Sequence, residues 1–331
     1  MEYRKIGNSE LKLSAITFGA FAIGGWLWGG TKQSESIDAI HSAYNSGITS
    51  FDTAPVYGQG TSEKLVGEAI KGIPREKIQI LTKYGLRWDI KQGAFYKHSV
   101  TNEGKKFDLH FFAGKKSVIE ECENSLRRLK TDYIDLYQIH WPDPSTPIEE
   151  TMEAVQQLIK DGKVRYVGVC NFSVKLMEEA SSCIPIVSDQ VPYSMVARNI
   201  EKDLVPYMIK ENKSVIAYSP MQRGLLTGKI KPEQTFGEGD QRSSMPFYTK
   251  ENIIKTNNFL ERIRPLAEEK KATLAQLVLR WTIHQPSITI ALAGARNAGQ
   301  ASQNAKAADI KLSKDDISFI NKELGKLKLE I

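Results

Sequence analysis

The sequence predicts a (β/α)₈ TIM barrel, built from a chain of 331 residues that forms one domain over residues 1–331. Eight short apolar runs alternate with segments of helical periodicity, and a chain of this length accommodates eight strand–helix units. The runs are almost wholly apolar, which indicates strands buried on both faces and therefore paired in parallel. A doubly wound sheet is the alternative, but the G-x-G-x-x-G turn expected after its first strand is missing.

The elements follow in order along the chain. Residues 3–13 are expected to form an antiparallel hairpin ahead of the barrel. The strands are then expected at residues 15–19, 48–53, 77–83, 133–140, 164–169, 186–191, 214–219 and 288–292. Apolar residues at helical spacing lie between them, as in the stripe Ile119, Cys122, Leu126, and Gly47 stands where the first helix should end. Each strand is thus predicted to be followed by a helix.

Two connections are longer than this pattern requires. Residues 85–114, rich in aromatic side chains, follow the third strand, and residues 222–247 follow the seventh. Both connections begin at the carboxyl ends of strands, which is where the active sites of barrel enzymes lie. We expect them to be long loops that cover or line a site.

Composition excludes several classes of protein. The chain carries 45 basic and 39 acidic residues, a formal charge of +6, and its basic residues are scattered instead of forming a nucleic-acid-binding stripe. Its three cysteines show no disulfide or metal-ligand spacing, so no metal is expected. The first residues lack the apolar core of a signal peptide, and no apolar stretch is long enough to span a membrane. A cytoplasmic location with no membrane partner is therefore expected; the oligomeric state is left open.

Four polar residues lie at or just after the ends of three consecutive strands. They are Asp52, Tyr57, Lys83 and His140. Each alone could be structural, as a helix cap, a packed aromatic, a rim lysine or a core histidine. Together they point to a site, because a lysine and an aspartate that end buried strands need partners. Neighbouring strand ends in a barrel bring such side chains together.

This set of residues suits proton transfer to a carbonyl oxygen. A phenol has a pKa of about 10, and an adjacent ammonium group is expected to lower it by stabilising the phenolate. Asp52 would keep Lys83 charged, and His140 could donate a hydrogen bond to a substrate oxygen. Such a site protonates an alkoxide as it forms, or deprotonates an alcohol in the reverse direction.

With these residues in this order, the chain resembles an aldo-keto reductase. It is similar both to bacterial members of that family and to its potassium-channel β-subunit-like branch. The motifs D-T-A-P-V-Y-G, T-K, Q-I-H-W, G-V-C-N-F-S, Y-S-P and G-A-R occur in family order across essentially the whole chain. The resemblance implies that Tyr57 is the proton donor, tuned by Lys83 and Asp52, and that His140 orients the substrate. It also implies a nicotinamide cofactor bound without a Rossmann motif.

The resemblance also implies which residues bind the cofactor, and these are assigned residue by residue. Asn171 and Gln190 match residues that bind the nicotinamide carboxamide, and Tyr218 matches the aromatic on which the ring stacks. Gly19, Ala20, Phe21 and Asp52 are also expected to bind the cofactor. The positions that match the pyrophosphate loop or lie in reach of it are Ser219, Pro220, Met221, Gln222, Arg223, Lys229 and Arg242, and those that match the adenosine and 2′-phosphate end are Gly294, Arg296, Gln300, Gln303 and Asn304.

Arg296 favours NADP(H), since a guanidinium binds a phosphate monoester bidentately; NAD(H) is the alternative. The sequence departs from the family pattern at Cys170, where many relatives have serine, and at Gln300 and Gln303, which are often basic and acidic respectively. Cys170 is expected to weaken one hydrogen bond beside Asn171, whereas Gln300 and Gln303 bear on cofactor preference and not on the fold or the reaction.

The substrate is expected to be a small aldehyde, ketone or sugar. The residues expected around it are Trp26, Trp28, Tyr57, Trp88, His140 and Trp141. Arg87 or Arg223 could favour an anionic substrate, but the sequence does not place their guanidinium groups. Two other functions remain open: a Schiff-base aldolase with Lys83 as nucleophile, and a non-catalytic partner protein on the same scaffold.

Overall fold

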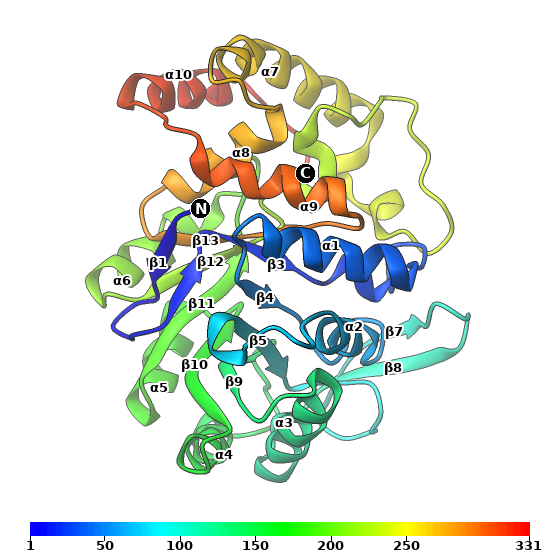
Figure 1. Ribbon diagram of the computed structural model, residues 1–331, viewed down its shortest axis with the longest axis vertical. Helices are drawn as coiled ribbons and strands as arrows, with labels where there is room; N and C mark the ends of the chain where they lie inside the picture. Colours follow the sequence, from blue (N-terminus) through cyan, green and yellow to red (C-terminus); the bar gives the residue numbers. More distant parts are fainter.

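Eight parallel strands close into a barrel, and their order along the chain is also their order around it (Figure 1). The computed structural model describes all residues 1–331. The barrel strands are β3 (Ile16–Gly19), β4 (Ser50–Asp52), β5 (Gln79–Tyr84), β9 (Ile134–Ile139), β10 (Val164–Cys170), β11 (Ile186–Pro192), β12 (Ser214–Tyr218) and β13 (Ile288–Gly294). The predicted barrel is thereby confirmed, and the ends of the expected strands agree within two residues.

An N-terminal hairpin closes one end of the barrel. It is formed by β1 (Tyr3–Lys5) and β2 (Lys12–Ser14), which pair antiparallel as the sequence predicts. Ile6, Leu11 and Leu13 from this hairpin pack against inward-facing strand residues such as Leu136 and Ile290. Because the interior is apolar at this end, the polar residues gather at the opposite end, where the strands finish.

Helices surround the barrel and cover its outer face (Figure 1). They are α1 (Gln33–Asn45), α2 (Thr61–Ala69), α3 (Lys115–Leu129), α4 (Ile148–Lys160), α5 (Val174–Cys183), α6 (Leu204–Lys210), α7 (Lys250–Glu269), α8 (Leu274–His284), α9 (Ala298–Ala305) and α10 (Lys314–Gly325). The expectation of one helix per strand is too simple, because two helices follow β12 and two follow β13. The additional helices α7 and α10 pack against each other. None of the ten has the length and apolar character needed to cross a membrane.

The connection at residues 85–114 is not the plain loop expected from the sequence. It holds β6 (Leu86–Arg87), β7 (Ala94–Val100) and β8 (Lys106–Phe111), which form a separate antiparallel sheet. Gly104, at φ +83°, allows the tight turn between β7 and β8. Figure 1 shows this hairpin projecting beyond the barrel near α2. It forms part of the wall above the carboxyl ends of the strands.

We expect the hairpin contact inside the barrel to contribute strongly to stability. Leu13 is fully buried, so Leu13→Ala should lower the free energy of unfolding by about 2–5 kcal/mol through the cavity it leaves. Ile209→Ala, at a side chain that is 56% exposed, should change it by less than about 0.5 kcal/mol. Urea denaturation of both variants checks this; equal effects would contradict it.

Candidate active site

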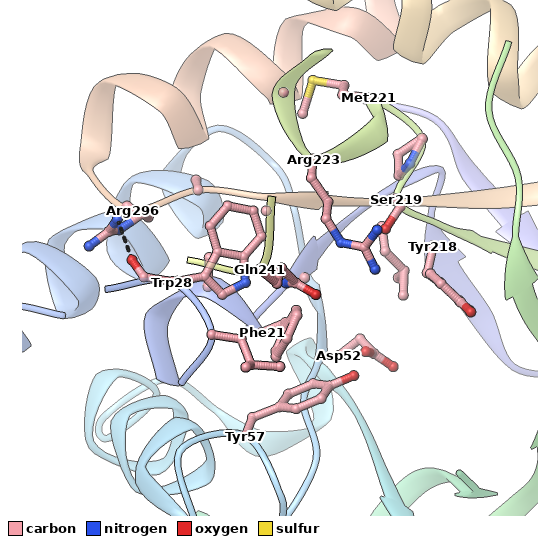
Figure 2. A pocket seen from close by; sticks show the side chains of 18 of the residues that line it. Phe21, Trp28, Asp52, Tyr57, Tyr218, Ser219, Met221, Arg223, Gln241 and Arg296 are labelled. Atoms are coloured by element: carbon pink, nitrogen blue, oxygen red, sulfur yellow. Dashed lines mark hydrogen bonds between the residues drawn. The ribbon is translucent and has the colours of Figure 1, made fainter. Parts of the chain in front are cut away.

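A cavity of about 1050 Å³ opens at the carboxyl ends of the barrel strands. It brings together residues from widely separated segments (Figure 2). The predicted residues that line it are Gly19, Phe21, Trp26, Trp28, Asp52, Tyr57, His140, Trp141, Asn171, Gln190, Tyr218, Ser219, Pro220, Met221, Arg223, Lys229, Arg242, Gly294, Arg296, Gln300, Gln303 and Asn304.

A buried ion pair lies at the floor of this cavity. The Nζ of Lys83 donates to Oδ1 of Asp52 at 2.6 Å and to the carbonyl oxygen of Thr53 at 2.8 Å. Lys83 is fully buried and Asp52 is 2% exposed. Burial works to lower the pKa of Lys83, but the charge of Asp52, its hydrogen bond to the ammonium group and the neighbouring Tyr57 and Cys170 together raise that pKa above its ordinary value. The lysine therefore stays an ammonium ion despite its burial.

The second oxygen of Asp52 is also occupied. The amide nitrogen of Gln190 donates to Oδ2 at 2.8 Å, and the amide nitrogen of Gln138 lies 3.4 Å from the same atom. The carboxylate is thus held from β5, β9 and β11 at once. This network fixes the position of the Lys83 ammonium group below Tyr57.

Tyr57 and His140 stand above the ion pair and face each other. The Lys83 Nζ lies 5.1 Å from the centre of the Tyr57 ring, and the Tyr57 and His140 ring centres are 5.6 Å apart in an edge-to-face arrangement. Figure 2 shows the Tyr57 hydroxyl directed toward Asp52 and the open space of the cavity. The structure therefore gathers the four residues that the sequence singled out.

The pKa of Tyr57 differs from the expectation. We expected Lys83 to lower it below 10, but burial raises the pKa of Tyr57 to about 12, and the nearby ammonium group only partly offsets this. The phenol is consequently protonated throughout the neutral range. Burial, together with the charge of Lys83, lowers the pKa of His140 well below its ordinary value, so its imidazole is neutral there.

Asn171 and Tyr218 form one side of the cavity. The Asn171 side chain donates to the carbonyl oxygen of His140 at 3.1 Å and accepts from the Tyr218 hydroxyl at 3.0 Å. Asn171 has φ +63° and Ser219 has φ +55°, a left-handed conformation that is uncommon outside glycine. Such conformations persist where the surrounding structure holds them, and here both residues line the cavity.

The far end of the cavity carries cationic side chains. Arg242 forms a two-pronged contact with Asp240, and Arg296 donates to the carbonyl oxygens of Trp28 and Gly30 at 3.2 and 2.7 Å. Lys229 is exposed and forms no ion pair. The amide oxygen of Gln300 accepts from the Arg296 backbone at 2.8 Å, which fixes the start of this segment.

A bridge crosses the cavity between its two walls. The backbone N–H of Gln241 donates to the carbonyl oxygen of Leu27 at 3.3 Å, and Trp28 and Asp240 are paired as an isolated antiparallel bridge. The Arg296 contact with Trp28, drawn as a dashed line in Figure 2, joins the same place. We call these contacts the clasp.

Some predicted residues do not line the cavity, and others were missed. Ala20, Gln222 and Trp88 are not among its lining residues. Trp88, which directly follows β6, packs against the apolar cluster that contains Leu86 and Leu109. Tyr96 and Lys97 on β7 line the cavity but were not singled out, since only the antiparallel pairing of the hairpin places them there.

Comparison with known proteins agrees with this geometry. The model of the aldo/keto reductase family matches residues 15–324. The chain belongs to the aldo/keto reductase family. This assignment confirms the resemblance drawn from the motifs, and the chain is accordingly an oxidoreductase of a family that uses nicotinamide cofactors.

Several relatives of this aldo-keto reductase are similar over nearly the whole chain. The aldo-keto reductase YhdN of Bacillus subtilis is 39% identical over 324 residues, covering 97% of this chain and 93% of that protein. The NADH-specific methylglyoxal reductase of Escherichia coli is 34% identical over 95% of this chain and 96% of its own length. The glycerol dehydrogenase AKR11B4 from Gluconobacter oxydans has a TM-score of 0.87 and 36% identity, covering 98% of this chain and 95% of its own.

The ion pair gives a prediction for stability. Asp52→Asn leaves the Lys83 ammonium buried without a counter-charge, so the free energy of unfolding should fall by about 3–5 kcal/mol. The double variant Asp52→Asn with Lys83→Met removes both charges and should recover part of this loss. Denaturation at pH 7 measures both; a double variant less stable than the single one would contradict the account.

Proposed function

We propose that this aldo-keto reductase reduces an aldehyde, ketone or sugar carbonyl to an alcohol, or runs the reverse reaction, with NADP(H) as preferred cofactor and Tyr57 as proton donor. The observation that carries the proposal is the Asp52–Lys83 ion pair, fixed directly below Tyr57 and beside His140. A protonated phenol, a neutral imidazole and an open cavity meet at this one place.

The cavity fits a dinucleotide in its chemistry. Amide side chains surround its catalytic end, where Asn171 and Gln190 lie, and cationic side chains stand at its far end, where Lys229, Arg242 and Arg296 lie. Tyr218 offers an aromatic ring beside Asn171. A bound NAD(P)H would supply the hydride, and these residues would hold its nicotinamide, pyrophosphate and adenosine parts.

The protein residues would manage the proton and the charge on the substrate oxygen. Neutral His140 would donate a hydrogen bond to the carbonyl oxygen and stabilise the negative charge that develops there. Tyr57 would give its proton to the same oxygen, and the Lys83 ammonium would stabilise the phenolate that remains. Because the pKa of Tyr57 is about 12, the donor form is fully populated at neutral pH.

The aldolase alternative finds no support in this arrangement. A Schiff base requires an accessible, neutral amine. Lys83 is fully buried, is not among the residues that line the cavity, and is held as an ammonium ion by Asp52. A non-catalytic protein, the other alternative, would have no need for Asp52, Tyr57, Lys83 and His140 to lie together.

Replacing the proposed proton donor should abolish most turnover. Tyr57→Phe removes the hydroxyl but keeps the ring, so we expect kcat to fall by about 10²–10⁴-fold while cofactor binding stays unchanged. NADPH oxidation with a panel of aldehydes measures turnover, and quenching of protein fluorescence measures binding. Tyr44→Phe on α1 is the control. Hydride transfer at the wild-type rate in the Tyr57 variant would disprove the proposed role.

Replacing Arg296 tests the cofactor preference. If its guanidinium binds the 2′-phosphate, Arg296→Ala should raise the KM for NADPH by about tenfold or more, as expected for loss of a charged hydrogen bond. The KM for NADH should change little, which provides the internal control for loss of the contact with Trp28. Equal KM values for the two cofactors in wild type and variant would refute NADP(H) preference.

A further inference from the structure

Two cationic side chains stand at the catalytic end of the cavity without an acidic partner. Arg223 comes from the turn after β12 and Lys97 from the hairpin strand β7, and both line the same cavity as Tyr57 and His140. Arg223 is partly buried, whereas Lys97 is exposed at the mouth. The Nζ of Lys97 lies 5.2 Å from the centre of the Tyr96 ring, and this partial burial of the ammonium group, followed by the charge of Arg223, lowers the pKa of Lys97.

The surroundings of Arg223 leave most of its hydrogen-bonding capacity unused. Its Nη1 donates to the Sδ of Met245 at 3.3 Å, a weak acceptor, and it takes part in no ion pair. Arg87, by contrast, is paired with Asp89, and Arg242 with Asp240. An arginine in such a position is a candidate for binding a ligand anion.

No carboxylate of the cavity is available to neutralise these cations. Asp52 is the one acidic residue among the lining residues, and its oxygens are taken by Lys83 and Gln190. The catalytic end of the cavity therefore has a positive electrostatic potential. The apolar rings of Trp26 and Trp141 also line this end, and a charge beside such surfaces is screened less than a charge in bulk water.

The backbone holds Arg223 in an unfavourable conformation that directs it into the cavity. Gln222 and Arg223 have φ +46° and +50°, a region that costs roughly 1–3 kcal/mol for residues other than glycine. The Tyr248 hydroxyl bonds the carbonyl oxygens of both, at 2.7 and 2.9 Å, and so secures the turn. Figure 2 shows the Arg223 side chain reaching from this turn toward the space above Tyr57, while Arg296 lies farther away beside Trp28.

We propose that Arg223, assisted by Lys97, is an anion-binding subsite for the substrate, so that the preferred substrates are aldehydes or ketones carrying a carboxylate or phosphate group. The guanidinium would bind the anion bidentately, and the lysine would add a point charge at the mouth. The inference rests on the proposed carbonyl reduction and adds the class of substrate. It also assigns Arg223 to the substrate instead of to the cofactor pyrophosphate, the role that the family resemblance implied.

A matched pair of substrates tests the subsite. Wild-type protein should reduce 4-carboxybenzaldehyde with a kcat/KM at least tenfold above that for methyl 4-formylbenzoate, which lacks the charge. Arg223→Gln should lower kcat/KM for the carboxylate by about tenfold or more, mainly through KM. Lys97→Gln should lower this kcat/KM about two- to fivefold, because its ammonium group is exposed.

Two controls accompany these measurements. The kcat/KM for the ester should change little in both variants, and Lys105→Gln, on the turn of the same hairpin, is the control for loss of charge. The pair glyceraldehyde 3-phosphate and glyceraldehyde shows whether phosphate is preferred to carboxylate.

Two binding measurements separate the possible failures. NADPH affinity, measured by fluorescence quenching, should be unchanged in Arg223→Gln; a weakened affinity with no loss of anion preference would place Arg223 on the cofactor and overturn the inference. Benzoate should bind the NADP⁺-loaded protein more tightly than benzamide, and Arg223→Gln should remove the difference. This difference tests the subsite even if no carbonyl is reduced, an outcome that would count against the proposed function alone. Equal binding of benzoate and benzamide to wild type would refute the subsite.

Discussion

The arrangement of the candidate active site depends on one buried ion pair, between Asp52 and Lys83. Neither charge could remain at the end of a barrel strand alone, because an unpaired buried ion is strongly unfavourable. Each satisfies the other, and amides from neighbouring strands complete the shell around the carboxylate. The position of the ammonium group is therefore fixed by the barrel and not by a flexible loop. Tyr57 comes shortly after β4 in the chain, so its ring is also held in a defined position relative to the ammonium group.

Different parts of the chain form the floor of the cavity and its walls. The hairpin at one end fills the interior with apolar side chains, so that polar groups collect at the other end. The strands that end there supply Asp52 and Lys83, while the walls of the cavity come from the β7–β8 hairpin and the turn after β12. The buried ion pair and the walls of the cavity thus come from different parts of the chain.

The sequence was sufficient for the parts of the molecule that depend on local pattern. The apolar runs predicted the strands, and the ends of these strands predicted the positions of Asp52, Lys83 and His140. In a closed parallel barrel the carboxyl ends of all strands lie at the same end of the barrel, so these side chains must be close together. The hairpin was missed because β7 mixes exposed Phe95 and Lys97 with partly buried Ser99, a pattern that resembles a loop. The sequence also misjudged the pKa of Tyr57, since the cost of burial depends on the packed structure. Arg223 could be named from the sequence, but only the turn that Tyr248 secures decides where its charge lies.

The clasp between the Leu27–Gly30 segment and residues 240–241 has a consequence for the exchange of ligands. An elongated molecule lying along the cavity passes a point where the two walls are joined by backbone hydrogen bonds and by Arg296. Each such bond contributes roughly 0.5–1.5 kcal/mol net, so thermal fluctuations suffice to break the few that are present. A ligand that passes beneath this crossing would then leave only when the clasp opens and the contacts at its two ends break together, so the clasp would add to its residence time.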